Sequence, residues 1–131
     1  MRLVLSTLIA LSAVACVSRP KSEAGPMVTL IVTDEAIRPS ENVQIQRFGS
    51  VAWFYEGESS RELTVTLDRS LGPSAQCSTT LGFVDVDSGT RGRIDRSTTP
   101  ILCFHDPGEY SYVVEGTNVP LRGKISVSWE E

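Results

Sequence analysis

From Met27 onward, short runs of alternating apolar and polar residues follow one another, and this pattern constrains the fold most. In "ELTVTL" (62–67), for example, Leu63, Val65 and Leu67 fall on one face of an extended strand. The runs are rich in β-branched and aromatic residues, and clusters of Gly, Pro, Asp and Ser separate them. Strands are therefore expected at 27–33, 43–47, 51–55, 62–67, 81–86, 91–95, 99–104, 109–115 and 123–129. Because no helical period of useful length occurs, the chain is predicted to be an all-β, antiparallel sandwich or barrel.

The same alternation predicts which side chains form the core. At about 2 kcal/mol for each fully buried side chain, they can offset the ordering entropy of a small domain. The inward-facing candidates are Leu30, Val32, Val43, Ile45, Val51, Trp53, Leu63, Val65, Phe83, Leu102, Phe104, Tyr110, Tyr112, Val114, Ile125 and Val127.

The N-terminus has the pattern of an export signal. Arg2 supplies a positive charge, residues 3–15 form an apolar run, and small residues lead to Cys16. The run is too short to span a bilayer comfortably as a helix, and the alternative is a core strand or helix. "SAVAC" resembles the lipobox of bacterial lipoproteins, although Ala13 stands where that family usually has leucine. The resemblance implies that Cys16 becomes the first mature residue and carries the lipid.

These features predict three segments: a signal peptide at 1–15, a polar tether at 16–26 and one domain at 27–131. The expected location is the periplasmic side of the cell envelope, where the lipid on Cys16 holds the protein to a membrane. Val17 replaces the aspartate that retains some bacterial lipoproteins at the inner membrane, which favours the outer membrane. A monomer is expected.

The charge balance and the cysteines narrow the partners and the chemistry. The chain has sixteen acidic and twelve basic residues. No run of basic residues supplies the positively charged surface that binding to nucleic acid requires. Once Cys16 is lipidated, Cys77 and Cys103 remain in an oxidising compartment, where a disulfide is the default. A loop of this length stabilises a fold by roughly 3 kcal/mol in chain-entropy estimates. Cys77 would also fix the irregular segment that is expected at 68–80.

Several stretches resemble the cupredoxins, the blue-copper β-sandwiches, and occur in that family's order. They are "IRPSENVQIQRFGSVAWFYEG", "DSG" at 87–89, "PGEYSYVV" and "LRGKISV". The resemblance covers roughly residues 28–128. It implies a Greek-key, cupredoxin-like sandwich and, in ordinary members of the family, a copper site.

The resemblance also implies where copper ligands would lie, and these positions hold unsuitable residues. The cysteine position falls on Val114, the second histidine on Thr117 and the methionine on Leu121. The first histidine falls on Arg61, or on Glu62 if the register slips by one. Val and Leu carry no donor atom, Thr offers a weak hydroxyl, and a guanidinium stays protonated. No copper and no other cofactor are therefore expected.

Other chemistry is weaker. Cys103 and the single histidine, His105, could form a displaced metal site, but a disulfide would consume the thiolate and His105 should lie at the opposite end from Val114. The adjacent side chains of His105 and Asp106 are expected to diverge, which disfavours an enzyme. Asp85 and Asp87 could hold Ca²⁺, although solvated strand polarity explains them as well.

A partner surface remains open. Phe54 should face away from Trp53, either exposed as an anchor or covered by the N-terminal segment. "NVPL" places Pro120 in an apolar loop tip beside Leu121, and the equivalent loop of blue-copper proteins is a docking face. The sequence thus predicts a non-catalytic binding or accessory module for an unidentified envelope protein. The alternatives are a copper protein for electron transfer or copper handling, and an enzyme.

Overall fold

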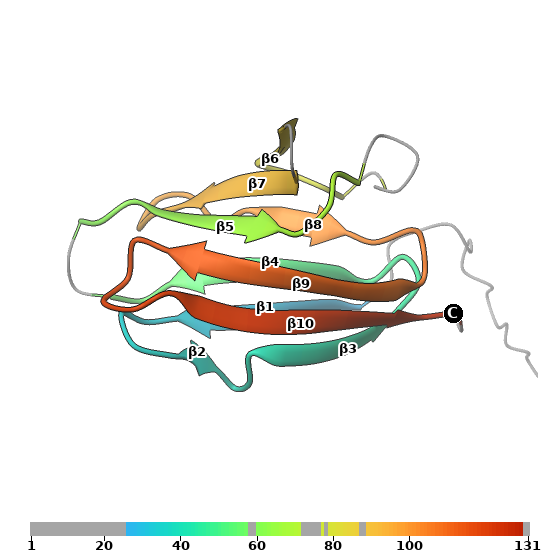
Figure 1. The fold of residues 1–131 in the computed structure, drawn as a ribbon, viewed down its shortest axis with the longest axis horizontal. Coiled ribbons are helices and arrows are strands. Elements are labelled where there is room, and N and C mark those ends of the chain that lie inside the picture. The colour runs from blue at the N-terminus through green and yellow to red at the C-terminus, as the bar shows by residue number, and fades with distance from the viewer. Residues whose placement is uncertain (1–25, 58–59, 72–76, 78, 87–88, 130–131) are drawn as a thin grey trace, which may run out of the picture.

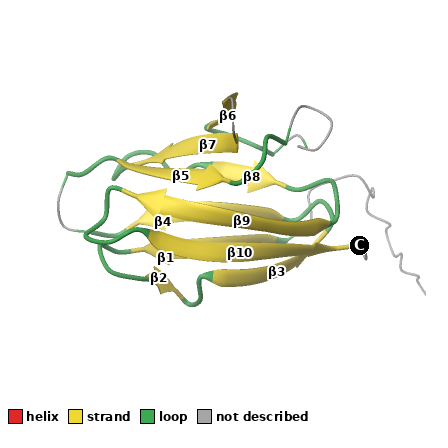
Figure 2. Ribbon diagram, in the orientation of Figure 1, coloured by secondary structure: helices red, strands yellow, loops and turns green. Residues whose placement is uncertain are grey.

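The computed structural model describes residues 26–57, 60–71, 77, 79–86 and 89–129, and ten strands lie in these ranges. The strands form two sheets that pack face to face (Figure 1). No helix appears among the described residues, which are strands and loops only (Figure 2). The described part therefore contains no helix long and apolar enough to cross a bilayer. The predicted all-β sandwich is confirmed.

The smaller sheet has four strands in the order β2–β1–β4–β8. Their bounds are β1 (Met27–Val32), β2 (Ile37–Arg38), β4 (Ser50–Tyr55) and β8 (Ile101–Cys103). The larger sheet has six strands in the order β3–β10–β9–β5–β7–β6. Their bounds are β3 (Asn42–Gln46), β5 (Leu63–Leu67), β6 (Phe83–Val86), β7 (Gly89–Ile94), β9 (Gly108–Glu115) and β10 (Leu121–Ser128).

Strand direction departs from the sequence-based expectation in each sheet. β1 runs parallel to β4, and β3 runs parallel to β10, whereas the other pairs are antiparallel. Both sheets are therefore mixed. Alternation along one strand specifies which face is buried, but it does not specify the direction of the neighbouring strand. β2 was not predicted, because two residues are too short to show a period.

The core follows the alternation of the strands. All predicted core residues are buried except Phe83, which packs against the core while remaining partly exposed. Trp53 lies at the centre, with the rings of Tyr112 and Phe83 at 5.5 and 5.6 Å between centroids. Seven further hydrophobic residues are buried but were not among the predicted core residues: Ile37, Ala52, Tyr55, Leu67, Leu71, Ile94 and Cys103.

Cys77 and Cys103 form the predicted disulfide, with a Cα–Cα distance of 5.3 Å. Cys103 is fully buried at the end of β8, so the bond ties the segment after β5 to the smaller sheet. No strand lies between Leu67 and Phe83 among the described residues, in agreement with the irregular segment that the sequence predicts there.

The sandwich has two ends, which we call the Met27 end and the Leu121 end. The Met27 end contains the first residues of β1 and β4 and the last residue of β10, because Met27 pairs with Ser50 in the register of β1 and β4. The Leu121 end contains the last residues of β1, β4 and β9 and the first residue of β10. The strands β9 and β10 connect the two ends (Figure 1).

Candidate functional site

Val114 and Leu121, two of the four positions that the resemblance singles out, face each other at the Leu121 end. Val114 pairs with Leu121 in the register of β9 and β10, and with Val65 in the register of β9 and β5. Val114 is fully buried, and Leu121 is partly buried and packed against the core. Apolar side chains of the hydrophobic core, or packed against it, therefore fill the two positions at which the resemblance would place the thiolate and the thioether of a copper site.

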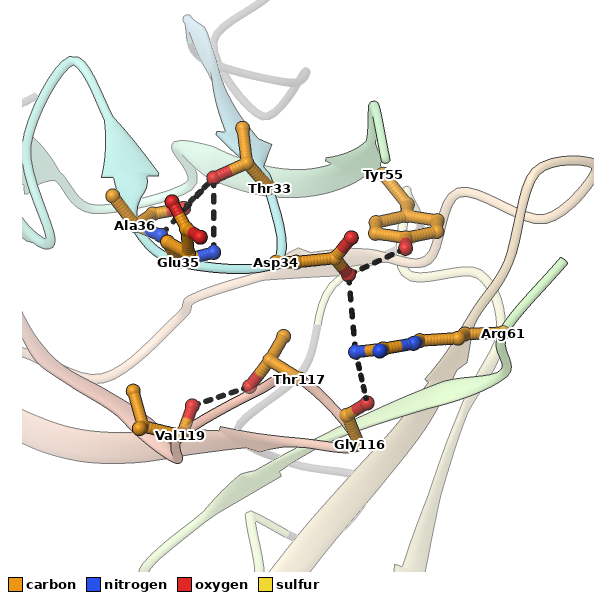
Figure 3. A network of polar contacts seen from close by, with 9 residues as sticks. All are labelled: Thr33, Asp34, Glu35, Ala36, Tyr55, Arg61, Gly116, Thr117 and Val119. Atoms are coloured by element: carbon orange, nitrogen blue, oxygen red, sulfur yellow. Dashed lines mark hydrogen bonds and ion pairs between the residues drawn. The ribbon is translucent and has the colours of Figure 1, made fainter. Parts of the chain in front are cut away.

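Arg61 connects three loops at this end (Figure 3). Its Nη1 lies 3.4 Å from Oδ1 of Asp34, which follows β1, and 3.3 Å from the carbonyl oxygen of Gly116, which follows β9. The Tyr55 hydroxyl, at the end of β4, donates a hydrogen bond of 2.6 Å to the same Asp34 oxygen. The positive charge of Arg61 is thus bound by oxygen atoms of two neighbouring loops, the Asp34 carboxylate and the Gly116 carbonyl.

Local backbone features hold these loops in place. The hydroxyl of Thr33 accepts hydrogen bonds from the backbone amides of Glu35 and Ala36, an arrangement that forms a tight turn around Asp34. The backbone amide of Asn118 donates to the Asp34 carbonyl at 3.1 Å. The β1–β2 turn and the β9–β10 loop are therefore joined by backbone as well as by Arg61.

Gly116 adopts a φ of 101°, a conformation that favours glycine. A Cβ atom at this position would lie 3.0 Å from the Glu62 carbonyl oxygen and from a side-chain carbon of Leu63. The loop can approach the start of β5 this closely because residue 116 has no side chain.

Thr117 is directed into its own loop. Its hydroxyl donates a hydrogen bond to the Val119 carbonyl oxygen. The side chain therefore closes the β9–β10 turn and is not directed at Arg61.

The sequence left open whether Arg61 or Glu62 occupies the first histidine position. Arg61 contacts the β9–β10 loop, whereas the Glu62 carboxylate lies 3.2 Å from Nε of Arg93 on β7 and is largely exposed. Of the two side chains, that of Arg61 is therefore the one that reaches the β9–β10 loop.

Copper does not fit the residues that are present. A valine, a leucine, a threonine bonded within its own turn and a protonated guanidinium supply neither thiolate, imidazole nor thioether. Within the described ranges, no three His, Cys, Asp or Glu side chains gather in an arrangement that could hold a metal ion.

His105 lies at the opposite end, as expected, since β9 separates it from Val114. Its Nδ1 lies 2.9 Å from Oδ1 of Asp106, so the expectation that these adjacent side chains diverge is wrong. The turn before β9 brings the two groups together, a geometry that strand alternation does not describe. Cys103 is bonded to Cys77 and is not a thiolate ligand for His105.

Other predicted site residues are placed separately. Phe54 on β4 is 39% exposed, and Pro120 is exposed immediately before β10. Asp85 accepts a hydrogen bond from the Thr90 hydroxyl at 2.9 Å. Cys16 and Asp87 lie outside the described residues, as do the signal peptide and all of the tether except Pro26.

The Leu121 end also presents Val119, which belongs to the stretch "NVPL" for which the sequence predicts an apolar loop tip. Val119 is 54% exposed beside Pro120 in the β9–β10 loop. An open groove begins at this loop and is lined by Glu35, Ala36, Ile37, Glu41, Pro120, Leu121 and Arg122.

Comparison with solved structures identifies the fold. Auracyanin B is 11% identical over 83% of this chain and 93% of its own, with a TM-score of 0.53. An amicyanin variant with Cu(I) is 14% identical over 82% of this chain and 87% of its own, with a TM-score of 0.53. A second amicyanin variant, in a reduced Cu(I) form at pH 4, is 15% identical over the same shares, with a TM-score of 0.51. These similarities confirm a cupredoxin-like sandwich.

The identification of the fold rests on the structural comparison alone. No protein-family model matches the chain, and a search of curated proteins finds no match.

Proposed function

We propose that this chain is an exported lipoprotein, anchored through Cys16 on the periplasmic side of the cell envelope, whose cupredoxin-like domain binds an envelope protein. In this proposal the domain works without copper and without catalysis. The lipobox-like "SAVAC" supports the anchor, and the exported location agrees with the Cys77–Cys103 disulfide.

The observation that carries the proposal is the chemistry of the four positions at the Leu121 end. Val114 is part of the core, Leu121 packs against it, Thr117 closes a turn, and Arg61 contacts Asp34 and Gly116. Each side chain has a structural partner that does not require a metal. A cupredoxin-like fold is therefore combined with side chains that serve packing and loop structure at these four positions.

The partner surface follows from what is exposed at this end. Val119 and Pro120 form an apolar tip, and the adjacent groove combines Ile37 and Leu121 with the charged side chains of Glu41 and Arg122. An apolar centre with a polar rim is the usual anatomy of a protein interface. Phe54 on the smaller sheet is a second exposed anchor.

Two measurements test the main claims. The protein purified from membranes should carry a diacylglyceryl group on Cys16 by mass spectrometry, and Cys16→Ser should release the protein from membranes. Addition of Cu(II) to the purified protein should give no intense thiolate-to-copper absorption. Absence of lipid on Cys16 would refute the anchor, and a blue product would restore a copper-binding function.

The partner is tested by photo-crosslinking in intact cells. A photoreactive residue at position 119 or 120 should give one discrete adduct, and the same residue at Ser111, exposed on the outer face of β9, should not. Val119→Asp should remove the adduct formed from position 120. Equal labelling from Ser111 would argue against a specific surface at the Leu121 end.

A copper carrier is the second candidate function, because the solved structures that share the fold include Cu(I) forms of amicyanin. The donor set of this chain disfavours it. Fractionation of membranes tests the predicted outer-membrane location, and sedimentation of the purified protein tests the predicted monomer.

A further inference from the structure

The Met27 end carries a stack of aromatic and cationic side chains that the proposed binding at the Leu121 end does not use. The guanidinium carbon of Arg47 lies 5.1 Å from the centroid of the Phe48 ring and 5.4 Å from that of the Trp129 ring. The Phe48 ring also meets the His105 ring edge to face at 5.2 Å. Trp129 is nevertheless 71% exposed, which is unusual for the largest apolar side chain.

The backbone holds this stack at one place. The amide of Arg47 donates to the Ser128 carbonyl at 3.1 Å, and Nε of Arg47 donates to the His105 carbonyl at 3.2 Å. The amide of Phe48 donates to the Phe104 carbonyl at 2.7 Å. The stack therefore has a fixed position at the end of β10.

Phe48 adopts a φ of 67°, the left-handed region that a bulky residue rarely occupies. Glycine or asparagine would take this conformation at lower energy, by roughly 1 kcal/mol. A ring at such a position indicates that the ring itself has a use, and its contacts are with Arg47 and His105.

The tether enters the domain at the same end. The amide of Ser50 donates to the Pro26 carbonyl at 3.0 Å, and Met27, which follows Pro26, is 51% exposed. Residues 17–25 separate Pro26 from Cys16. Even fully extended, that segment spans only about 35 Å. A lipid on Cys16 would thus keep the Met27 end close to the bilayer.

We propose that the Met27 end rests on the phospholipid surface, with the Trp129 indole in the interfacial layer beside Met27 and Phe48. This inference rests on the proposed lipid anchor. Tryptophan favours the membrane–water interface because its ring is apolar and its N–H can still reach a polar partner. The anchor raises the effective concentration of lipid, so weak insertion of a few side chains suffices to orient the domain.

The charges nearby specify the kind of lipid. Arg47 is basic, as are Arg19 and Lys21 in the tether, but they are not clustered, and acidic groups offset them: Asp106 is hydrogen-bonded to His105, and the sequence continues after Trp129 with Glu130 and Glu131. Acidic groups disfavour an anionic surface, whose attraction for proteins depends on clustered Lys and Arg. The contact is therefore with zwitterionic headgroups and with the start of the acyl chains, and it should respond little to salt.

The orientation explains how the proposed binding surface is presented. β9 has eight residues, which extend over about 26 Å. With the Met27 end on the bilayer, Val119 and Pro120 stand on the side of the domain away from the lipid, where a periplasmic partner can reach them.

The chain offers a direct readout, because it has two tryptophans and Trp53 is fully buried in the core. The lipidated protein, purified from membranes, is reconstituted into phosphatidylcholine vesicles with or without lipids brominated near the headgroup end of the acyl chain. We expect brominated lipid to reduce the fluorescence emission of Trp129. We also expect iodide in the buffer to quench Trp129 much less in the vesicle-bound protein than in the soluble domain, which is released without detergent by cleavage within residues 17–25. Both effects should persist at high salt.

The matched control is Trp129→Phe, in which the remaining emission of Trp53 should be insensitive to both quenchers. A Trp129 that stays accessible to iodide and unaffected by brominated lipid would overturn the inference. It would leave the proposed anchor unaffected, since mass spectrometry tests the lipid on Cys16 separately. Protection of Trp129 in native envelopes but not in pure lipid vesicles would also overturn it, because a protein would then cover this end.

Discussion

Val114 and Leu121 are register partners across β9 and β10, and both belong to or pack against the hydrophobic core. The resemblance places a thiolate at the first position and a thioether at the second. In this chain the two positions contribute apolar packing, and the loop between them is held by Arg61 through the Gly116 carbonyl. Side-chain packing and one cation therefore organise the Leu121 end of the sandwich.

A first prediction restores the donors. Arg61→His, Val114→Cys, Thr117→His and Leu121→Met together should create copper binding, because Arg61 already contacts the β9–β10 loop, which contains Thr117 and joins Val114 on β9 to Leu121 on β10. The measurement is visible absorption on titration with Cu(II), with Glu62→His replacing Arg61→His as the matched control for register. A folded quadruple variant that fails to bind copper would show that these side chains do not converge.

A second prediction concerns the link between loops. Arg61→Ala should destabilise the domain by about 1 kcal/mol, since the guanidinium is partly exposed and its contacts are screened. Amide exchange should accelerate at Gly116 and Asn118. The control is Arg38→Ala, which removes the exposed pair with Glu56 and should change stability little. Equal effects of the two substitutions would contradict a particular role for Arg61.

A third prediction concerns the disulfide. Replacing both Cys77 and Cys103 with alanine should lower the free energy of unfolding by about 3 kcal/mol, because the bond closes a loop with a sequence separation of 26. Urea denaturation measures the change. Thiol labelling of the denatured, unreduced protein should find both cysteines blocked, and labelling of either would show that the bond does not form in the cell.

A fourth prediction tests a close contact under β10. A Cβ atom on Gly123 would overlap the Glu41 carbonyl oxygen and the Tyr112 hydroxyl, which are themselves hydrogen-bonded at 2.7 Å. Gly123→Ala should therefore cost about 1–3 kcal/mol of stability by denaturant titration. Combination with Tyr112→Phe should cost less than the sum of the two single changes, because the hydroxyl is one of the clashing groups. Strict additivity would place the strain elsewhere.

A fifth prediction follows from the buried phenols. Burial, reinforced by the negative charge of Glu41, raises the pKa of Tyr112 well above its usual value. Burial is also the main reason that the pKa of Tyr110 is raised. In the unfolded chain a tyrosine has a pKa of about 10, and in the folded chain the pKa of these two tyrosines is higher. Their protonated hydroxyls therefore contribute fully to stability below about pH 10, and this contribution is lost as the pH rises further.

Unfolding should therefore become steeply pH-dependent above about pH 10, and tyrosinate absorbance should appear together with loss of structure. Tyr112→Phe should weaken this dependence. Ionisation of all the tyrosines at ordinary pKa values in a chain that stays folded would contradict the burial of these hydroxyls.

The strands were largely predictable because each is a local pattern. β5 and β9 were placed within one residue of their observed bounds from alternation alone, and the buried residues followed from the same period. Two differences between the prediction and the structure are local. The strand β2 was not predicted because two residues are too few to show a period. Tyr55 was left out of the predicted core, although alternation places it on the same face of its strand as Trp53.

The candidate site was predictable only in its chemistry. The residue types at positions 61, 114, 117 and 121 exclude a soft-metal donor set without any coordinates. The partners of those side chains were not predictable, because Asp34, Arg61 and Gly116 come from three loops that are distant along the chain.

The sequence by itself determined the all-β class and the inward faces of the strands, since each depends on residue type and local spacing. It also predicted the pairing of Cys77 with Cys103, by setting Cys16 aside, and, through the resemblance to the cupredoxins, the unsuitable residues at the four ligand positions. Only the tertiary structure decided that β1 runs parallel to β4 and that Arg61 joins the loops around Asp34. It also brought Arg47, Phe48 and Trp129 together at the end where Pro26 enters. These contacts join residues far apart in the chain, and their geometry is set by how the two sheets pack, which no local pattern encodes.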